Sequence, residues 1–230
     1  FSSGDWGNFT GSSDINTTLL SPRVIFKQDV AGIKNTLTAG IDYQKADNDI
    51  LNDSLFFGTR SIGVFDLKKE DIGYFAHDEV NITDSLRISG GYRHDRARFS
   101  FQPSTPESVS MSVDAYTAGV NYVFLKPSYA YMSYSRGFRY PLLDELFSFF
   151  TNTINIALVP QVSNNYEVGV RHYFSDSFYI HANAFRLDTE QEIFFNPVTY
   201  QNENLDGKTR RQGVEVSFET KPMNSLTVRG

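Results

Sequence analysis

A period of two governs the run Leu86-Arg87-Ile88-Ser89-Gly90-Gly91-Tyr92-Arg93. Leu, Ile and Tyr stand at its even positions, whereas Arg and Ser stand at its odd positions. Successive side chains of a β-strand point to opposite faces of a sheet, so the pattern predicts a strand with one apolar and one polar face. The same alternation recurs in residues 36–43, 116–124, 166–171 and 214–219. We therefore expect an all-β protein.

The spacing of these runs predicts an antiparallel meander. Ten strands are expected, at about residues 22–30, 34–47, 69–80, 85–100, 112–124, 127–136, 161–174, 177–190, 208–221 and from 225 onward. Short turns alternate with long connections, which are residues 48–68, 101–111, 137–160 and 191–207. In a meander all the long connections fall at one end. Short periplasmic turns opposite long extracellular loops are typical of a transmembrane β-barrel of the bacterial outer membrane.

A soluble β-sandwich is the main alternative, because its strands also alternate. Several expected strands exceed the usual length of about 5 to 6 residues and reach the ~9 to 11 that a tilted membrane strand needs. Aromatic residues near the strand ends fit the girdles of a membrane barrel, although aromatics are enriched in all strands. These residues are Tyr43, Tyr74, Tyr92, Tyr122, Phe124, Tyr173 and Phe174. Strand length and loop asymmetry favour the barrel.

Composition excludes several other classes. No apolar run approaches the roughly 18 residues of a transmembrane helix. The net charge of −6 and the scattered basic residues argue against a nucleic-acid partner. The absence of Cys suits an oxidising compartment. Residues 1–6 show neither an initiator Met nor a secretion signal, so we expect an internal fragment of a longer protein.

Several segments spread over residues 70–220 carry the motifs of one family of barrel proteins. Residues 74–79 and 90–95 are similar to a strand-turn-strand unit ending in Gly-x-Arg-x-Asp, here Gly91-Tyr92-Arg93-His94-Asp95. The strongest match is Ser135-Arg136-Gly137-Phe138-Arg139-Tyr140-Pro141-Leu142-Leu143-Asp144-Glu145-Leu146-Phe147, where a strand of the family enters an extracellular loop. Residues 158–171 resemble the next strand, with Gln161 where the family usually has Glu, and residues 212–216 resemble a later one.

Together these segments resemble the barrel of the TonB-dependent receptor family. The resemblance implies a barrel of 22 strands, an N-terminal plug and a short box that contacts TonB. Residues 1–230 would then be a partial barrel without the plug and the C-terminal end of the barrel. The implied function is TonB-coupled uptake of a scarce nutrient through the outer membrane, most often a ferric siderophore, with cobalamin, haem or a glycan as other cargoes. An uncoupled porin or adhesin barrel and a soluble all-β binding module are the alternatives. The implied partners are outer-membrane lipid and, through the missing N-terminal part, the TonB complex.

The long loops are the expected ligand-binding elements, because binding residues concentrate on loops carried by a rigid scaffold. Aromatic rings and guanidinium groups would suit a ferric siderophore. The candidates are Phe56, Phe57, Arg60, Arg139, Phe149, Phe150 and Tyr200. Charged residues on the polar strand faces are expected to line the barrel lumen, where they would contact the plug or each other. They are Arg87, Arg93, Glu167, Arg171, Glu215 and Glu219.

No enzyme is expected, since the sequence contains no nucleophile elbow, Cys-x-x-Cys motif or phosphate-binding Gly loop. His77 and His94 are expected two strands apart in paired positions, each beside an acid, and could in principle hold a metal. We interpret them as ordinary polar strand residues and expect neither a metal nor a cofactor. A partial barrel has unpaired edge strands. We therefore expect the fragment to close into a smaller barrel or to associate with a second copy.

Overall fold

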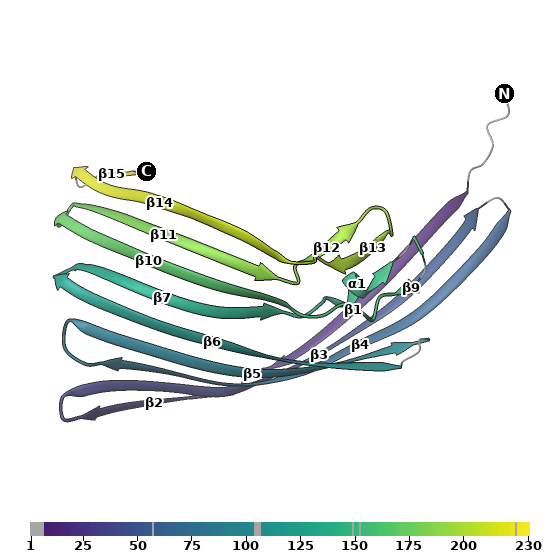
Figure 1. Ribbon diagram of the computed structural model, residues 1–230, viewed down its shortest axis with the longest axis horizontal. Helices are drawn as coiled ribbons and strands as arrows, with labels where there is room; N and C mark the ends of the chain where they lie inside the picture. The colour runs from purple at the N-terminus through teal and green to yellow at the C-terminus, as the bar shows by residue number, and fades with distance from the viewer. Residues whose placement is uncertain (1–6, 57, 104–106, 149, 152, 224) are drawn as a thin grey trace.

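The computed structural model describes residues 7–56, 58–103, 107–148, 150–151, 153–223 and 225–230. These residues form one curved, open, antiparallel sheet, with short elements lying beside one end of it (Figure 1). The sheet has 11 strands in the order β1-β3-β4-β5-β6-β7-β10-β11-β14-β15, with β2 also paired to β3. The smaller barrel is thus not adopted, and association through the open edges stays a prediction.

The strands of the main sheet make up most of the chain. They are β1 (Asn8–Leu20), β2 (Arg23–Val30), β3 (Ile33–Phe56), β4 (Thr59–Asn81), β5 (Leu86–Gln102), β6 (Ser108–Leu125), β7 (Ser128–Arg139), β10 (Gln161–Ser175), β11 (Phe178–Glu190), β14 (Lys208–Met223) and the short β15 (Leu226–Arg229). The remaining elements belong to two loops. They are α1 (Leu143–Leu146), β8 (Phe147–Ser148), β9 (Thr153–Ile154), β12 (Ile193–Asn196) and β13 (Gln201–Asn204).

The antiparallel meander of the sequence analysis is confirmed, with two corrections. Each of the ten expected strands is present, but β1 is an additional strand that pairs with β3. The prediction of long loops at 48–68 and 101–111 is wrong. Strands β3 and β4 pair along their whole length to Phe56 and Thr59, and strands β5 and β6 pair as far as Ser100 and Ser108. Two of the four long connections therefore shorten to hairpin tips.

The polarity of the two sheet faces reverses partway along the strands, which explains the missed strand segments. We call the face against which α1 packs the inner face and the opposite one the outer face. On β4, Ile72 and Tyr74 lie on the outer face, whereas Phe65 and Leu67, nearer the loops, lie on the inner face and are buried. The apolar positions thus change from even to odd along one strand. A simple alternation of apolar and polar residues therefore does not continue past this level, and the strand segments beyond it were predicted as loops.

A band of tyrosines marks the level of the reversal. Six adjacent strands each place one Tyr on the outer face in neighbouring rows of the register: Tyr43, Tyr74, Tyr92, Tyr116, Tyr134 and Tyr166. On the side away from the loops the outer face carries exposed apolar side chains, and on the loop side it carries charged ones such as Arg96 and Arg98. An apolar outer band bounded by aromatic residues is the surface that a membrane barrel presents to lipid.

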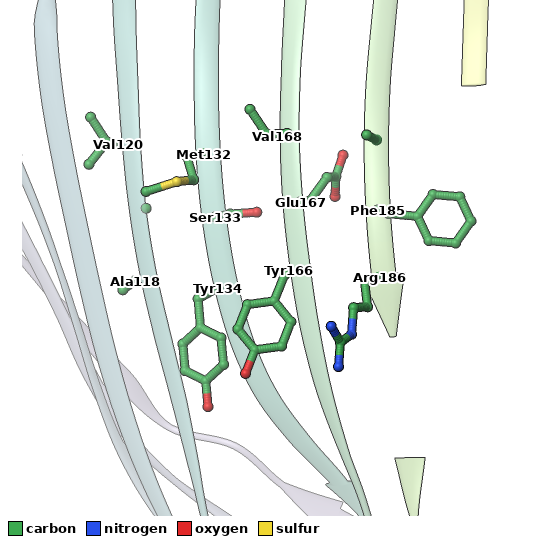
Figure 2. A pocket seen from close by; sticks show the side chains of 12 residues that line it. Ala118, Val120, Met132, Ser133, Tyr134, Tyr166, Glu167, Val168, Phe185 and Arg186 are labelled. Carbon is green, nitrogen blue, oxygen red and sulfur yellow. The ribbon is translucent and has the colours of Figure 1, made fainter. Parts of the chain in front are cut away.

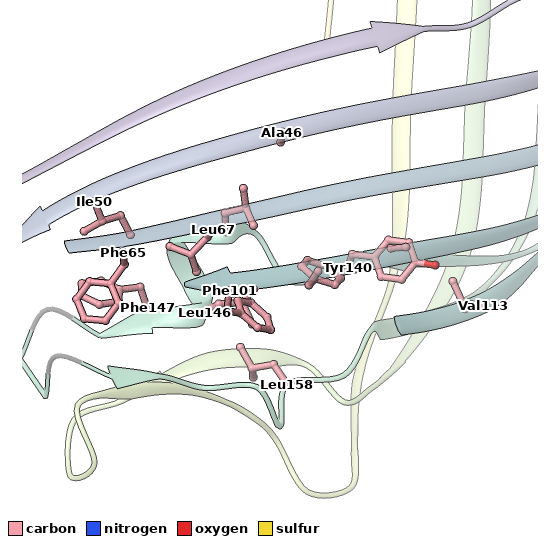
Figure 3. Packing of buried hydrophobic residues seen from close by; sticks show 13 residues of the cluster. Ala46, Ile50, Phe65, Leu67, Phe101, Val113, Tyr140, Leu146, Phe147 and Leu158 are labelled. Carbon is pink, nitrogen blue, oxygen red and sulfur yellow. The ribbon is translucent and has the colours of Figure 1, made fainter. Parts of the chain in front are cut away.

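The buried apolar core lies on the loop side of the tyrosine band, between the inner face and the segment 140–158 (Figure 3). Leu67, Phe99 and Phe101 contribute from the sheet, and Leu146 and Leu158 contribute from the segment, each at most 1% exposed. The rings of Phe65 and Phe147 lie with their centroids 4.7 Å apart. Burial of these side chains fixes the segment on the sheet. Within the described residues, no helix has both the length and the apolar character needed to cross a bilayer.

Candidate functional site

Two loops at the same end of the sheet form one unit, which we call the paired loops and define as residues 140–160 and 191–207. The first contains α1, β8 and β9, and the second is the hairpin β12–β13 (Figure 1). Phe147 pairs with Ile154 in the first loop, and Ile193 pairs with Asn204 in the second. The loops lie side by side because β10 and β11, whose upper ends they adjoin, are neighbours in the sheet.

Asparagine side chains join the paired loops through main-chain groups. Asn155 Nδ2 donates to the Asn202 carbonyl at 2.8 Å, and Asn202 Nδ2 donates to the Glu145 carbonyl at 2.9 Å. Asn204 accepts from the Val159 N–H at 2.8 Å and donates to the Val159 carbonyl at 3.0 Å. These bonds replace the backbone pairing that irregular loops lack, so they hold the loops in one shape. These asparagines were not predicted as functional residues, because the spacing of Asn residues in a loop does not indicate which groups they will bind.

Charged pairs fix the base of each loop. Glu145 accepts from Arg139 Nη1 at 2.6 Å and from the Leu142 N–H at 2.9 Å. Glu192 accepts from Arg211 Nη2 at 2.6 Å and also from the Thr209 hydroxyl. The hydrogen bond from Arg211, followed by the one from Thr209, lowers the pKa of Glu192 below its ordinary value of 4.5. Arg139, an expected ligand residue, thus has its guanidinium bound to Glu145, and its contact with a ligand stays a prediction.

An aromatic pair lies at the exposed surface of the paired loops. Phe150 comes from the first loop and Tyr200 from the second, and their ring centroids are 5.1 Å apart. Phe150 is 77% exposed and Tyr200 is 48% exposed. Both are expected ligand residues, and the structure brings them together. Exposed rings held in place by a hydrogen-bonded backbone can stack on a planar ligand with little loss of side-chain freedom.

Of the other expected ligand residues from the strand ends and loop tips, only the side chain of Arg60 is described, and it does not join this pair. Arg60 lies in β4 instead of a loop, and its Nη2 binds Asp53 Oδ2 of β3 at 2.6 Å. It is paired with Leu55 on the outer face. Phe56 ends β3, but its side chain lies outside the described structure, as do Phe57 and Phe149. The structure thus assembles Phe150 and Tyr200 and separates Arg60 from them.

All six expected lumen residues lie on the inner face. In the cross-strand register each of them is paired with a residue of the inner face. The six are Arg87, Arg93, Glu167, Arg171, Glu215 and Glu219. Arg93 binds both Asp42 and Asp95, and Glu167 accepts from the Tyr131 hydroxyl at 2.6 Å. Most of the six thus contact side chains from neighbouring strands. Their role as a lumen wall stays a prediction.

The two histidines considered for a metal lie on opposite faces. His77 pairs with Gly91 on the inner face, and His94 pairs with Tyr74 on the outer face. His94 Nδ1 lies 2.8 Å from Asp114 Oδ1. The expectation that the two histidines lie two strands apart in paired positions is therefore wrong. Strands β4 and β5 are neighbours, and His94 lies three residues away from Gly91, the partner of His77. Among the described residues, no group of three or more His, Asp or Glu side chains is placed to hold a metal.

Comparisons with known proteins agree with the sheet topology. The family profile described as TonB dependent receptor-like, beta-barrel, matches residues 1–229. A search of curated proteins found no match. Similar solved structures include BauA, the ferric preacinetobactin receptor from Acinetobacter baumannii, with 15% identity and a TM-score of 0.72 over 96% of this chain and 36% of that one.

Two further structures show the same fold. The ferric yersiniabactin uptake receptor FyuA from Yersinia pestis has 15% identity and a TM-score of 0.71, over 95% of this chain and 34% of that one. The copper transporter OprC has 15% identity and a TM-score of 0.72, over 93% of this chain and 36% of that one. This chain thus spans about a third of the length of these structures. Identities this low establish the fold alone.

Proposed function

Because this chain belongs to the family of TonB-dependent receptor β-barrels, whose members lie in the bacterial outer membrane, we propose that it forms part of the wall and the outer loops of a nutrient importer. Residues 1–230 would be one part of a larger barrel. The plug, the box that contacts TonB and the strands that pair with the open edges would come from the rest of the protein. The protein would act as a transport receptor and not as an enzyme.

The paired loops carry the proposal for ligand capture. They form one hydrogen-bonded surface at the loop end of the sheet, on the side of the tyrosine band where the outer face becomes charged. The Phe150 and Tyr200 rings are exposed at this surface with their centroids 5.1 Å apart. The aromatic pair is the single observation that favours a planar, partly apolar ligand over a small inorganic ion.

A ferric siderophore is the cargo that this surface fits best. Aromatic rings would cover the apolar part of the chelate, and the charged inner-face network around Arg93 would lie along the route inward. BauA is described as a receptor for ferric preacinetobactin and FyuA as an uptake receptor for ferric yersiniabactin, whereas OprC is described as a copper transporter, so the fold serves more than one cargo. An uncoupled porin or adhesin barrel is the rival function.

Uptake of radiolabelled ferric siderophores by cells that express the complete receptor tests the proposal. We expect uptake that requires TonB, and a loss of about tenfold or more in siderophore binding for the double variant Phe150→Ser with Tyr200→Ser, since exposed aromatic anchors dominate such contacts. Val198→Ser is the matched control, because Val198 is 83% exposed on the same hairpin but is not aromatic.

Three outcomes separate the rival functions. Uptake that persists without TonB would support an uncoupled porin. Binding that requires the aromatic pair but involves another ligand, such as cobalamin or haem, would retain the receptor and change the cargo. Equal loss of binding in the Val198→Ser control would refute the specific role of the aromatic pair.

A further inference from the structure

The outer face carries a groove that the proposed uptake function does not use. The groove has a volume of about 460 Å³ and crosses strands β6, β7, β10 and β11. Its apolar lining includes Ala118, Val120, Met132, Val168 and Ala184. In Figure 2, Val120, Met132 and Val168 lie at one end, and the rings of Tyr134 and Tyr166 lie side by side at the other. The groove therefore runs from the tyrosine band into the apolar part of the outer face.

A basic cluster stands at the tyrosine end of the groove. Arg186 lies beside Tyr166 (Figure 2), and its Nε and Nη2 bind Asp188 Oδ2 at 3.0 and 2.8 Å. Arg210 Nε binds the other oxygen, Asp188 Oδ1, at 2.7 Å. Asp188 is buried and its two oxygens are occupied, so it holds two guanidinium groups close together while neutralising only one of them.

The cluster keeps both a positive charge and unused donors. Among the described residues, Nη1 of Arg186 and both Nη atoms of Arg210 have no hydrogen-bond partner. The next charges toward the loops do not neutralise the cluster, because Lys208 binds Glu190 at 2.7 Å and these two cancel. Guanidinium groups with free paired donors match the geometry of a phosphate.

The position of the groove defines its occupant. The tyrosine band marks the interface between the apolar and the charged parts of the outer face, and the paired loops lie on the charged side. The arginine cluster is therefore level with the headgroups of the outer leaflet, and the apolar groove is level with the acyl chains. A soluble anion would match the arginines but not the groove, whereas an acylated phosphate matches both.

We propose that this groove binds one phosphorylated lipid of the outer leaflet, with an acyl chain along Met132 and Val168 and a phosphate on Arg186 and Arg210. The inference rests on the placement of the chain in the outer membrane, but it is independent of the cargo. Asp188 is a positioning residue, since it orients both guanidinium groups and does not itself bind the phosphate. The Tyr134 and Tyr166 rings separate the headgroup region from the chain region.

Native mass spectrometry of the complete receptor in mild detergent tests the inference, with purified lipid A as the probe. We expect one lipid A to stay bound to the wild type, and a reduction of about tenfold or more in affinity for the double variant Arg186→Gln with Arg210→Gln, because a phosphate would lose two charged donors. Ala184→Phe fills the groove and is expected to weaken binding while the arginines remain. The control is Arg96→Gln with Arg98→Gln, which removes two outer-face arginines of β5 outside the groove.

The outcomes are distinct from those of the uptake experiment. Folding of each variant is checked by its shift on an unheated gel, so a lost lipid cannot be confused with a lost barrel. Retention of lipid A by the arginine variant would overturn the inference, as would equal binding of lipid A from which the phosphates have been removed. Inorganic phosphate that binds as tightly as lipid A would also overturn it, since the groove would then contribute nothing. Siderophore uptake is expected to remain in all these variants.

Discussion

Replacing Leu146 with Ala should release the paired loops from the sheet while leaving the strands intact. Leu146 is 1% exposed and packs in the core between the segment 140–158 and the inner face. Truncation of a buried Leu to Ala removes about 2 to 5 kcal/mol of stability, depending on how far the site collapses. Since each 1.4 kcal/mol is a tenfold change in an equilibrium, the ratio of docked to released loops should fall by at least about 25-fold.

Hydrogen exchange of the complete receptor in detergent measures this ratio locally. Amides of residues 143–160 and 193–204 should lose protection, whereas those of the strand segment 112–124 should not, because the loops open as a unit of their own. Leu142→Ala is the matched control, since Leu142 is 54% exposed and its truncation should change stability by about 0.5 kcal/mol or less. Equal protection in the two variants would refute the assignment of the core as the anchor of the loops.

Two further predictions concern the same loops. Asn204→Ala should weaken the link between them by about 0.5 to 1.5 kcal/mol, because it removes exposed hydrogen bonds to main-chain groups that water can then reach; faster exchange in residues 191–207 would show this, and unchanged exchange would contradict it. The pKa of Glu192 is lowered in the folded state, so its bond to Arg211 stabilises the hairpin above pH 4.5, and this contribution is lost as the pH falls from there through the folded pKa. A spin label at Val198 should therefore become more mobile on acidification, and the step should vanish in Glu192→Gln.

The membrane-facing half of the sheet was predictable because its two environments are uniform. On the side of the tyrosine band away from the loops, the strands have lipid on one face and the polar inner side on the other, so a strict period of two results. Leu86, Ile88 and Tyr92 of β5 all lie on the outer face, as their spacing predicts. Arg87 and Arg93 lie opposite on the inner face.

The loop-side half was not predictable from that period, because its environments are exchanged. On β5 the apolar residues change from Tyr92 to Phe99 and Phe101, which are odd-numbered and buried under the paired loops. Strand β1 carries no burial pattern, since all 13 of its residues are exposed, and its pairing with β3 places it in the sheet. Burial by a loop that is remote in sequence leaves no local signal.

The candidate site was predictable in its residue types but not in its assembly. Phe150 and Tyr200 were identifiable as loop aromatics, yet their contact depends on Asn155, Asn202 and Asn204, which bind main-chain atoms. Arg60 was misplaced because the segment that contains it was expected to be a loop and is a strand. Contacts between a side chain and a backbone do not require a complementary residue type, so sequence gives no partner for them.

The asparagine links have a consequence for how this surface can change over time. They hold the loops by their peptide groups, which every residue except Pro offers equally. The exposed side chains of Phe150, Val198 and Tyr200 take no part in these hydrogen bonds. The residues that hold the loop backbone are thus different from the exposed residues that would contact a ligand. A lineage under pressure to take up a new nutrient, or to escape recognition at the cell surface, could exchange these side chains while the framework beneath them stays constant.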